Sequence, residues 1–165
     1  MDVFGVLVIA LLTSGSAQAQ SFCERLTTLV KAVPSDFRQL RGKLVSASDG
    51  PGRRYEADLP LVTEGDCSVS EFPGGGATYS CVWHTGDAVT RADALVKEAE
   101  GCLAAAAERR AVLPLTGQTD RTDWMIRTHI GEQDAVVYVS GIETFTLRPD
   151  PPDRRLVLLV TRARN

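Results

Sequence analysis

Two stretches of the chain carry apolar residues at the three- and four-residue spacing of a helix that buries one side. In the first stretch these residues are Cys23, Leu26, Val30 and Val33. Ser21 precedes them and Glu24 follows that serine by three positions, which is the spacing of a capping box. Pro34 stops the pattern. The sequence therefore predicts a helix between Ser21 and Pro34.

The second stretch, residues 87–109, has the longer apolar stripe. Its members are Ala88, Val89, Ala92, Leu95, Val96, Ala99, Cys102, Leu103 and Ala106. Charged residues lie off this stripe, and Asp87 stands where an N-cap residue is expected. The sequence predicts a second helix over 87–109 whose cysteine, Cys102, points inward.

The remaining segments alternate between apolar and polar residues, which is typical of strands. Strands are predicted over 53–59, over both arms of a hairpin spanning 67–81, and over 122–130, 135–140, 142–147 and 155–161. Turn residues occupy 131–134 and 148–153. The expected order is α-βββ-α-βββ(β). Residues 20–165 should form a single α+β domain in which the helices pack on one face of an antiparallel sheet.

The segment CSVSEFPGGGATYSC, residues 67–81, predicts a hairpin closed by a disulfide. Folding it around Gly74 places Phe72 opposite Gly76, Val69 opposite Tyr79 and Cys67 opposite Cys81. Opposed residues in an antiparallel pair have Cβ atoms about 4.5–5.5 Å apart, close enough for a disulfide. The glycines supply the positive φ angles that a tight turn needs.

Other interpretations of this segment fail on spacing. Zinc sites place paired cysteines two to four residues apart, and a thioredoxin-like motif needs C-x-x-C. A phosphate-binding loop needs Lys-Ser or Lys-Thr after its glycines, followed by a helix. None of these patterns is present in residues 67–81. The two remaining cysteines both point inward from helices, so elimination pairs Cys23 with Cys102.

The first residues of the chain predict export. An apolar run, VFGVLVIALL, is followed by small residues, and Ala17-Gln18-Ala19 fits the small-x-small cleavage rule. We expect a signal peptide over residues 1–19 and a mature protein in the periplasm or secreted space. The run is shorter than the roughly 20 apolar residues that span a bilayer, so no membrane insertion is expected after cleavage. Disulfides belong to such an oxidising compartment.

Charge and motifs narrow the function without identifying it. Cleavage removes one acidic residue, Asp2, which leaves a mildly acidic chain and no sign of nucleic-acid binding. The arginine pairs 53–54, 109–110 and 154–155 are interpreted as solvated ends of elements. His84 and His129 have no neighbouring pattern of metal ligands. We therefore expect no catalytic, metal-binding or cofactor-binding residue and no cofactor, although a carboxylate pair for glycoside cleavage stays open.

The aromatic residues of the predicted strands leave one question open. Core packing is the simpler interpretation, but a set on the sheet face away from the helices would form a patch for protein or glycan contact. These residues are Tyr55, Tyr79, Trp83, Trp124 and Tyr138.

The order of a cysteine-bearing helix, the cysteine hairpin and a helix ending in Cys102-Leu103 resembles small exported bacterial proteins. That resemblance implies no activity. The leading hypothesis is a non-catalytic binding module of the envelope or secreted space: an inhibitor, an immunity factor or an adaptor with a protein partner. The alternatives are an accessory subunit of an envelope complex and a small hydrolase.

Overall fold

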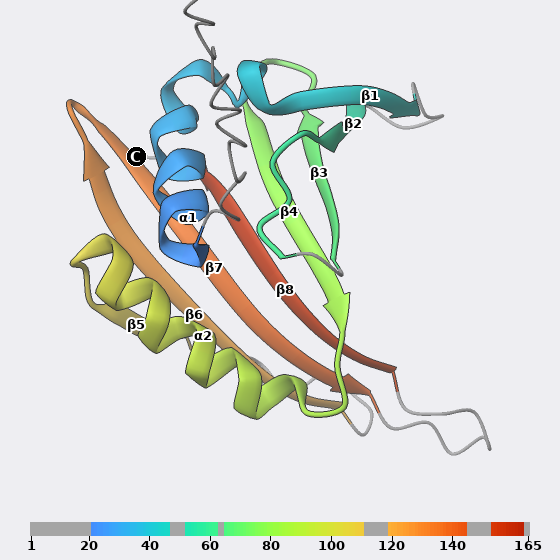
Figure 1. Ribbon diagram of the computed structural model, residues 1–165, viewed down its shortest axis with the longest axis vertical. Helices are drawn as coiled ribbons and strands as arrows, with labels where there is room; N and C mark the ends of the chain where they lie inside the picture. Colours follow the sequence, from blue (N-terminus) through green and yellow to red (C-terminus); the bar gives the residue numbers. More distant parts are fainter. Residues whose placement is uncertain (1–20, 47–51, 63–64, 111–118, 145–152, 164–165) are drawn as a thin grey trace, which may run out of the picture.

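The computed structural model describes residues 21–46, 52–62, 65–110, 119–144 and 153–163 (Figure 1). Two α-helices, two short 3-10 helices and eight strands make up these described residues. Their bounds are α1 Phe22–Ala32, η1 Val33–Ser35, η2 Arg38–Leu40, β1 Arg41–Ser46, β2 Arg53–Ala57, β3 Asp66–Glu71, β4 Ala77–His84, α2 Ala88–Leu103, β5 Ala107–Arg110, β6 Thr119–Ile130, β7 Gln133–Thr144 and β8 Asp153–Arg162. The expected signal peptide, residues 1–19, lies outside the described residues.

The strands form one antiparallel sheet whose order mirrors itself about the middle. The order is β1-β2-β3-β4-β8-β7-β6-β5, so each half of the sheet is a four-strand meander. α1 precedes the first meander in the chain, and α2 precedes the second. β4 and β8 pair in the centre, from Thr78 opposite Thr161 to His84 opposite Arg155. The topology therefore repeats a unit of one helix and four strands, although the two halves show no sequence self-similarity.

The predicted class, helices packed on one face of an antiparallel sheet, holds in this coarse form, and the predicted order is partly correct, because it lacks one strand of the first half. The observed order is α-ββββ-α-ββββ. The prediction missed β1, where the consecutive apolar residues Leu44 and Val45 break the alternation that indicates a strand. The predicted strand 135–140 and the described part of the predicted strand 142–147 belong to a single strand, β7, which continues through Gly141, while residues 145–147 lie outside the described residues.

The second helix is shorter than predicted. α2 ends at Leu103, and the next residue, Ala104, adopts a left-handed conformation with φ 48°. The residues that were expected to continue the helix form the edge strand β5, with Ala107 opposite Ile126. The alanines before β5 favour a helix locally, so hydrogen bonding to β6 has overridden their intrinsic propensity.

Both helices lie on the same face of the sheet, in front of it in Figure 1. The alternate strand residues that face them are buried and form the core together with the apolar sides of the helices. The largest fully buried side chains include Tyr79, Phe37, Leu26, Leu29, Ile126 and Leu158. These residues come from both halves of the chain, so the two meanders share one core.

A glutamate from the sheet caps the amino end of α2. Glu143 Oε1 on β7 accepts a hydrogen bond from the Ala88 N–H at 3.1 Å and one from the Val89 N–H at 3.5 Å. Asp87 occupies the predicted N-cap position, but its side chain makes no capping bond. A Cβ on Gly141 would lie 2.4 Å from the Ala88 carbonyl oxygen. Glycine at that position therefore lets α2 approach β7 closely enough to be capped.

Both predicted disulfides are present. Cys67–Cys81 joins directly opposed residues of β3 and β4, and Cys23–Cys102 joins the start of α1 to the end of α2. The second bond therefore links the two halves of the chain on the helix side of the sheet. A pair of structural disulfides is typical of an oxidising, extracytoplasmic compartment. Within the described ranges, no helix is long and apolar enough to cross a membrane.

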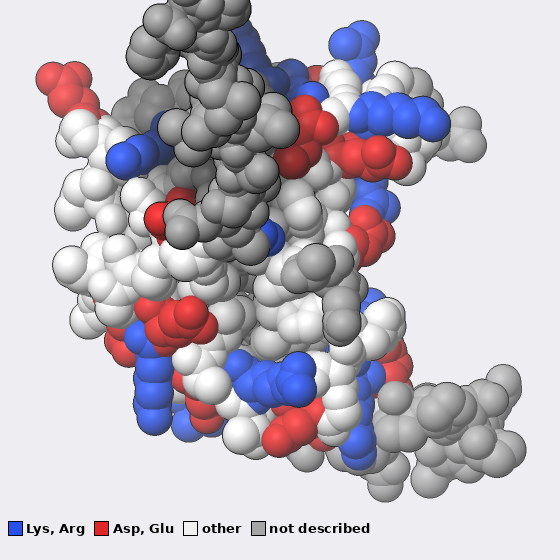
Figure 2. Space-filling view, in the orientation of Figure 1, with Lys and Arg blue, Asp and Glu red and all other residues white. Residues whose placement is uncertain are grey.

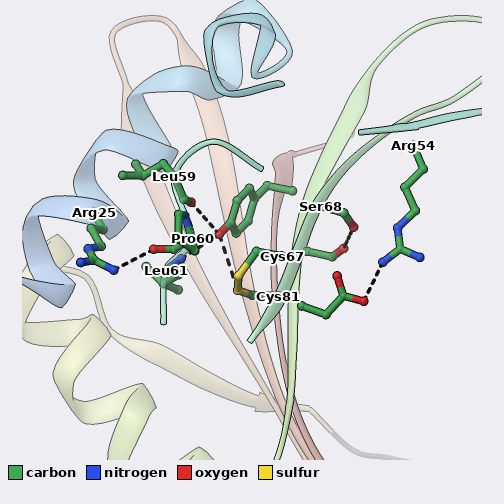
Figure 3. The surroundings of a disulfide bond; sticks show 11 residues. Arg25, Arg54, Leu59, Pro60, Leu61, Cys67, Ser68 and Cys81 are labelled. Atoms are coloured by element: carbon green, nitrogen blue, oxygen red, sulfur yellow. Dashed lines mark hydrogen bonds and ion pairs between the residues drawn. A yellow bond between two sulfur atoms is a disulfide. The ribbon is translucent and has the colours of Figure 1, made fainter. Parts of the chain in front are cut away.

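The hydroxyl of Tyr79 holds the segment between β2 and β3 against the core (Figure 3). It donates to the Leu59 carbonyl and accepts from the Leu61 N–H, both at 3.0 Å. Arg25 of α1 donates to the neighbouring Pro60 carbonyl at 2.9 Å. Burial raises the pKa of Tyr79 from 10.0 to about 12, while the Leu61 hydrogen bond and the Arg25 charge oppose the rise. The core therefore strongly favours the neutral phenol.

Replacing Glu143 tests the cap of α2. Glu143→Ala leaves the first helical N–H groups without an acceptor, so the free energy of unfolding should fall by about 0.5–2 kcal/mol. Urea unfolding with the disulfides intact measures this change. Glu132→Ala, at the exposed turn between β6 and β7, is the matched control and should change stability little. Equal effects of the two substitutions would contradict the capping role.

Replacing Tyr79 tests the buried hydroxyl. At neutral pH, Tyr79→Phe should lower the free energy of unfolding by about 1–3 kcal/mol, because the buried Leu61 N–H loses its acceptor. The wild-type advantage is complete below the ordinary tyrosine pKa near 10 and should shrink as the pH rises toward about 12, because only unfolding lets this hydroxyl ionise freely. Urea unfolding of both proteins at a series of pH values measures the difference. A difference that stays constant through this range would rule out the proposed ionisation.

Candidate functional site

A glycine turn at one end of the sheet joins β3 to β4. Gly74, Gly75 and Gly76 have φ angles of 90°, 97° and 89°, a region that other residues rarely adopt. The Phe72 N–H donates to the Gly76 carbonyl at 3.1 Å, which closes the turn in the predicted register. No described atom lies within 4 Å of the positions that Cβ atoms on these glycines would occupy. The backbone of the turn is therefore open to an approaching molecule.

The chain reverses direction between η1 and η2, beside this turn. Asp36 and Phe37 both adopt the left-handed conformation, with φ angles of 52° and 56°, which is uncommon for residues other than glycine. Phe37 is fully buried, and its ring centroid lies 6.3 Å from that of Tyr79. Core packing of Phe37 thus holds a backbone conformation that is unfavourable by itself. The reversal places Asp36 and Arg38 next to the glycine turn.

Two adjoining hollows lie between the reversal and the turn, and together we call them the hairpin-tip groove. The larger has a volume of about 490 Å³. The smaller, of about 480 Å³, shares Asp36, Phe72, Gly75 and Gly76 with it. Charged residues from five elements or connections line the larger hollow: Asp36, Arg38, Arg41, Arg53 and Glu71. A groove of this size can accept a small molecule or a short piece of another protein.

One wall of the groove is a polar cluster joined by hydrogen bonds and an ion pair between its own members. Arg41 Nη1 lies 2.5 Å from Glu71 Oε1, and Arg41 Nη2 donates to the Asp36 carbonyl at 2.9 Å. The guanidinium also lies over the Tyr55 ring, 5.4 Å from its centroid, and the Tyr55 hydroxyl donates to Glu71 Oε2 at 3.1 Å. Since the Arg41 and Glu71 side chains are only 16% and 29% exposed, this cluster is a fixed part of the wall.

The remaining charged side chains of the groove carry more positive than negative charge. The Asp36 carboxylate lies 3.4 Å from the guanidinium of Arg162, which lines the smaller hollow. Arg38 and Arg53 are exposed, and neither forms an ion pair with any residue that the structure describes. Figure 2 shows positive and negative side chains mixed over the end of the molecule that holds β1 and β2. Among the described residues that line the larger hollow, Arg38 and Arg53 are the exposed arginines without an ion-pair partner.

Exposed apolar side chains lie on the groove and on the edge strand β1, two strands away from β3. Within the described ranges, the exposed large hydrophobic residues are Leu44 (45%), Val45 (52%) and Phe72 (48%). Leu44 and Val45 belong to β1, an edge strand with two register irregularities against β2. Phe72 follows β3, whose last residue, Glu71, pairs with Arg53 of β2. Edge strands with exposed apolar residues are sites where other chains can pair or pack.

The histidines do not form a joint site. His84 lies at the end of β4 and pairs with Asp153 at 3.7 Å, whereas His129 lies at the end of β6 and pairs with Asp134 at 2.5 Å. These two strand ends are at opposite ends of the sheet in Figure 1. Among the described residues, no group of three or more histidines, cysteines or carboxylates could hold a metal ion.

The arginine pairs are also separated, because they lie on different strands and successive residues of a strand point to opposite faces. Arg53 lies at the groove, while Arg54 pairs with Asp66. Residues 109–110, on the opposite edge of the sheet, stack over Trp124 and Tyr138. Arg154 donates to the Gly86 carbonyl, and Arg155 pairs with Asp153.

The aromatic residues do not form a patch on the far face. Tyr55, Tyr79, Trp83 and Trp124 lie on the helix side of the sheet, where Trp124 Nε1 donates to Asp93 of α2 at 2.9 Å. Of the five aromatic residues considered from the sequence, only Tyr138 points away from the helices. The core interpretation is therefore correct for four of them.

The other predicted turns contribute less than the glycine turn. Residues 132–134 border a hollow of about 160 Å³ beside Arg162. Most of the turn at 148–153 lies outside the described residues. The glycine turn was predicted from the sequence, and the pair 53–54 was interpreted as a solvated end. Asp36, Arg38, Arg41 and Glu71 were not predicted as groove residues, because no local pattern brings these separate segments together.

The chain matches no protein-family model, curated protein or solved structure in the three comparisons with known proteins. The geometry of the groove and the edge strand therefore has to support a functional proposal by itself.

Replacing Glu71 tests whether the polar cluster holds the groove wall. Glu71→Gln removes the charge that faces the mostly buried Arg41, so the free energy of unfolding should fall by about 1–3 kcal/mol. Glu56→Gln, an exposed position on the neighbouring strand β2, is the matched control and should stay within about 0.5 kcal/mol of wild type. Urea unfolding of the three proteins measures the comparison. Indistinguishable stabilities would mean that the wall does not depend on this ion pair.

Proposed function

We propose that this protein is a non-catalytic binding module of the bacterial envelope or secreted space, and that it contacts a protein partner. The contact surface is the corner formed by the hairpin-tip groove and the edge strand β1. The observation that carries this proposal is the half-exposed Phe72 on an open groove, with the exposed residues Leu44 and Val45 on the edge strand β1 two strands away. Apolar side chains that gather at a polar-rimmed surface are a usual feature of protein contact sites.

The disulfides and the polar cluster around this corner favour a binding role without a large conformational rearrangement. One disulfide closes the hairpin that carries the glycine turn, and another ties α1 to α2. The polar cluster of Arg41 and Glu71 connects β1 to β3. A surface that is already ordered loses little conformational entropy on association, so more of its contact energy is available as affinity.

The proposal is tested by partner capture with tagged mature protein, residues 20–165, from an envelope extract. Phe72→Asp and Val45→Asp each place a charge in the proposed contact, and each should reduce capture of the wild-type partner by tenfold or more. Lys97→Glu, on the exposed side of α2, is the charge-changing control and should capture the partner normally. If both corner variants capture normally while Lys97→Glu abolishes capture, α2 is the contact surface and the proposal is wrong.

The nature of the captured material separates the three functional classes. One soluble enzyme in equal amount favours an inhibitor or immunity factor, whereas several membrane components favour an accessory subunit. Turnover of a generic ester or glycan by the protein alone would favour a hydrolase and contradict a non-catalytic role.

A further inference from the structure

Two arginines of the hairpin-tip groove, neither of which forms an ion pair with another described residue, point to the chemistry of what binds there. Arg38 comes from η2 and Arg53 from β2, and both line the larger hollow. The two carboxylates that line the same hollow are engaged elsewhere, Glu71 by Arg41 and Asp36 by Arg162. An anion that entered the hollow would therefore meet two exposed guanidinium groups without displacing an existing ion pair.

We infer that the groove binds a carboxylate from an acidic segment of a partner protein, with an apolar residue of that segment packed on Phe72. This inference rests on the proposed function, since it assigns chemistry to the same corner. A guanidinium offers a planar pair of donors that matches the two oxygens of a carboxylate. Phe72 borders both hollows and is half exposed, so an apolar neighbour of the bound carboxylate has a contact within reach.

A protein carboxylate fits the groove better than a phosphate group does. Glu71 and Asp36 remain in the walls, and their charges oppose a dianion more strongly than a monoanion. The exposed Phe72 at the rim gives no contact to a free phosphate, but it suits an apolar side chain that flanks a carboxylate in a protein.

The glycine turn allows such a segment to approach. Space is open where Cβ atoms on Gly74, Gly75 and Gly76 would stand, so a bound chain can lie directly against the turn. Gly52 lines the same hollow and is held close to β3, because a Cβ there would lie 2.3 Å from the Glu71 carbonyl oxygen. Backbone of both β3 and the glycine turn is therefore part of the wall of the hollow.

The test is a titration of isotope-labelled mature protein, followed by the backbone amide signals of its NMR spectrum. The probes are two blocked peptides, acetyl-Gly-Leu-Glu-Leu-Gly-amide and its analogue with glutamine in place of glutamate. The glutamate peptide should shift the amide signals of Phe72 and of the three turn glycines at low-millimolar concentration. The glutamine peptide should bind at least tenfold more weakly, because it lacks the charge that the arginines recognise. Added salt should weaken binding of the glutamate peptide.

Paired variants assign the effect to the two arginines. R38Q combined with R53Q should weaken binding of the glutamate peptide by tenfold or more, whereas R91Q on the exposed surface of α2 should not change it. Unchanged amide signals elsewhere show that each variant keeps its fold. Equal binding of the two peptides, absence of shifts with either, or unchanged binding by the double variant would overturn the inference. Tighter binding of inorganic phosphate than of the glutamate peptide would also overturn it.

Different experimental results would contradict the carboxylate inference and the proposed function. If Phe72→Asp abolishes partner capture while the double arginine variant captures normally, the corner is a protein contact but does not recognise a carboxylate. If the glutamate peptide binds as expected and both Phe72→Asp and Val45→Asp capture normally, the groove binds carboxylates but the partner contacts another surface.

Discussion

The antiparallel pairing of β4 with β8 holds this fold together. These strands end the two helix-and-four-strand units, and seven residue pairs join them from Thr78 opposite Thr161 to His84 opposite Arg155. Without this pairing each unit would be a small meander with one helix, too small to bury a sizeable core. With it, Tyr79 and Cys81 of β4 lie in the same buried layer as Leu158 and Val160 of β8. The Cys23–Cys102 bond then fixes the helices above that layer.

The shape of the candidate site depends on buried residues of this core. Phe37 keeps its left-handed conformation because its ring is buried against Tyr79, and that conformation sets Asp36 and Arg38 beside the glycine turn. Tyr79 also holds the segment that leads into β3 through its bonds to Leu59 and Leu61. A groove at the end of the sheet is therefore shaped by residues in its centre, which makes its geometry rigid although its surface is exposed.

Several local features were predictable because neighbouring residues determine them. The capping box of Ser21 and Glu24 is formed, with the Glu24 N–H donating to Ser21 Oγ at 3.3 Å. The hairpin register, from Val69 opposite Tyr79 to Cys67 opposite Cys81, follows from a short turn and the period of two along a strand. Elimination paired the two remaining cysteines correctly, because the hairpin had already accounted for the other two, although Cys23 is exposed and Cys102 is half-buried.

Other features depend on residues that are distant in the sequence. The cap of α2 comes from Glu143 on β7, which lies 55 residues beyond Ala88, so Asp87 was a reasonable but incorrect expectation for the capping side chain. β5 becomes a strand because β6 offers it hydrogen bonds, although its alanine-rich surroundings favour a helix. The groove collects Asp36, Arg41, Arg53 and Glu71 from separate elements. By itself, the sequence determined the helices and the hairpin, because neighbouring residues set them. It also determined the cysteine pairing, because joining Cys67 to Cys81 left one possible pair. Only the tertiary structure decided the strand order, the covered face and the charged groove, because these depend on hydrogen bonds and packing between residues far apart in the chain.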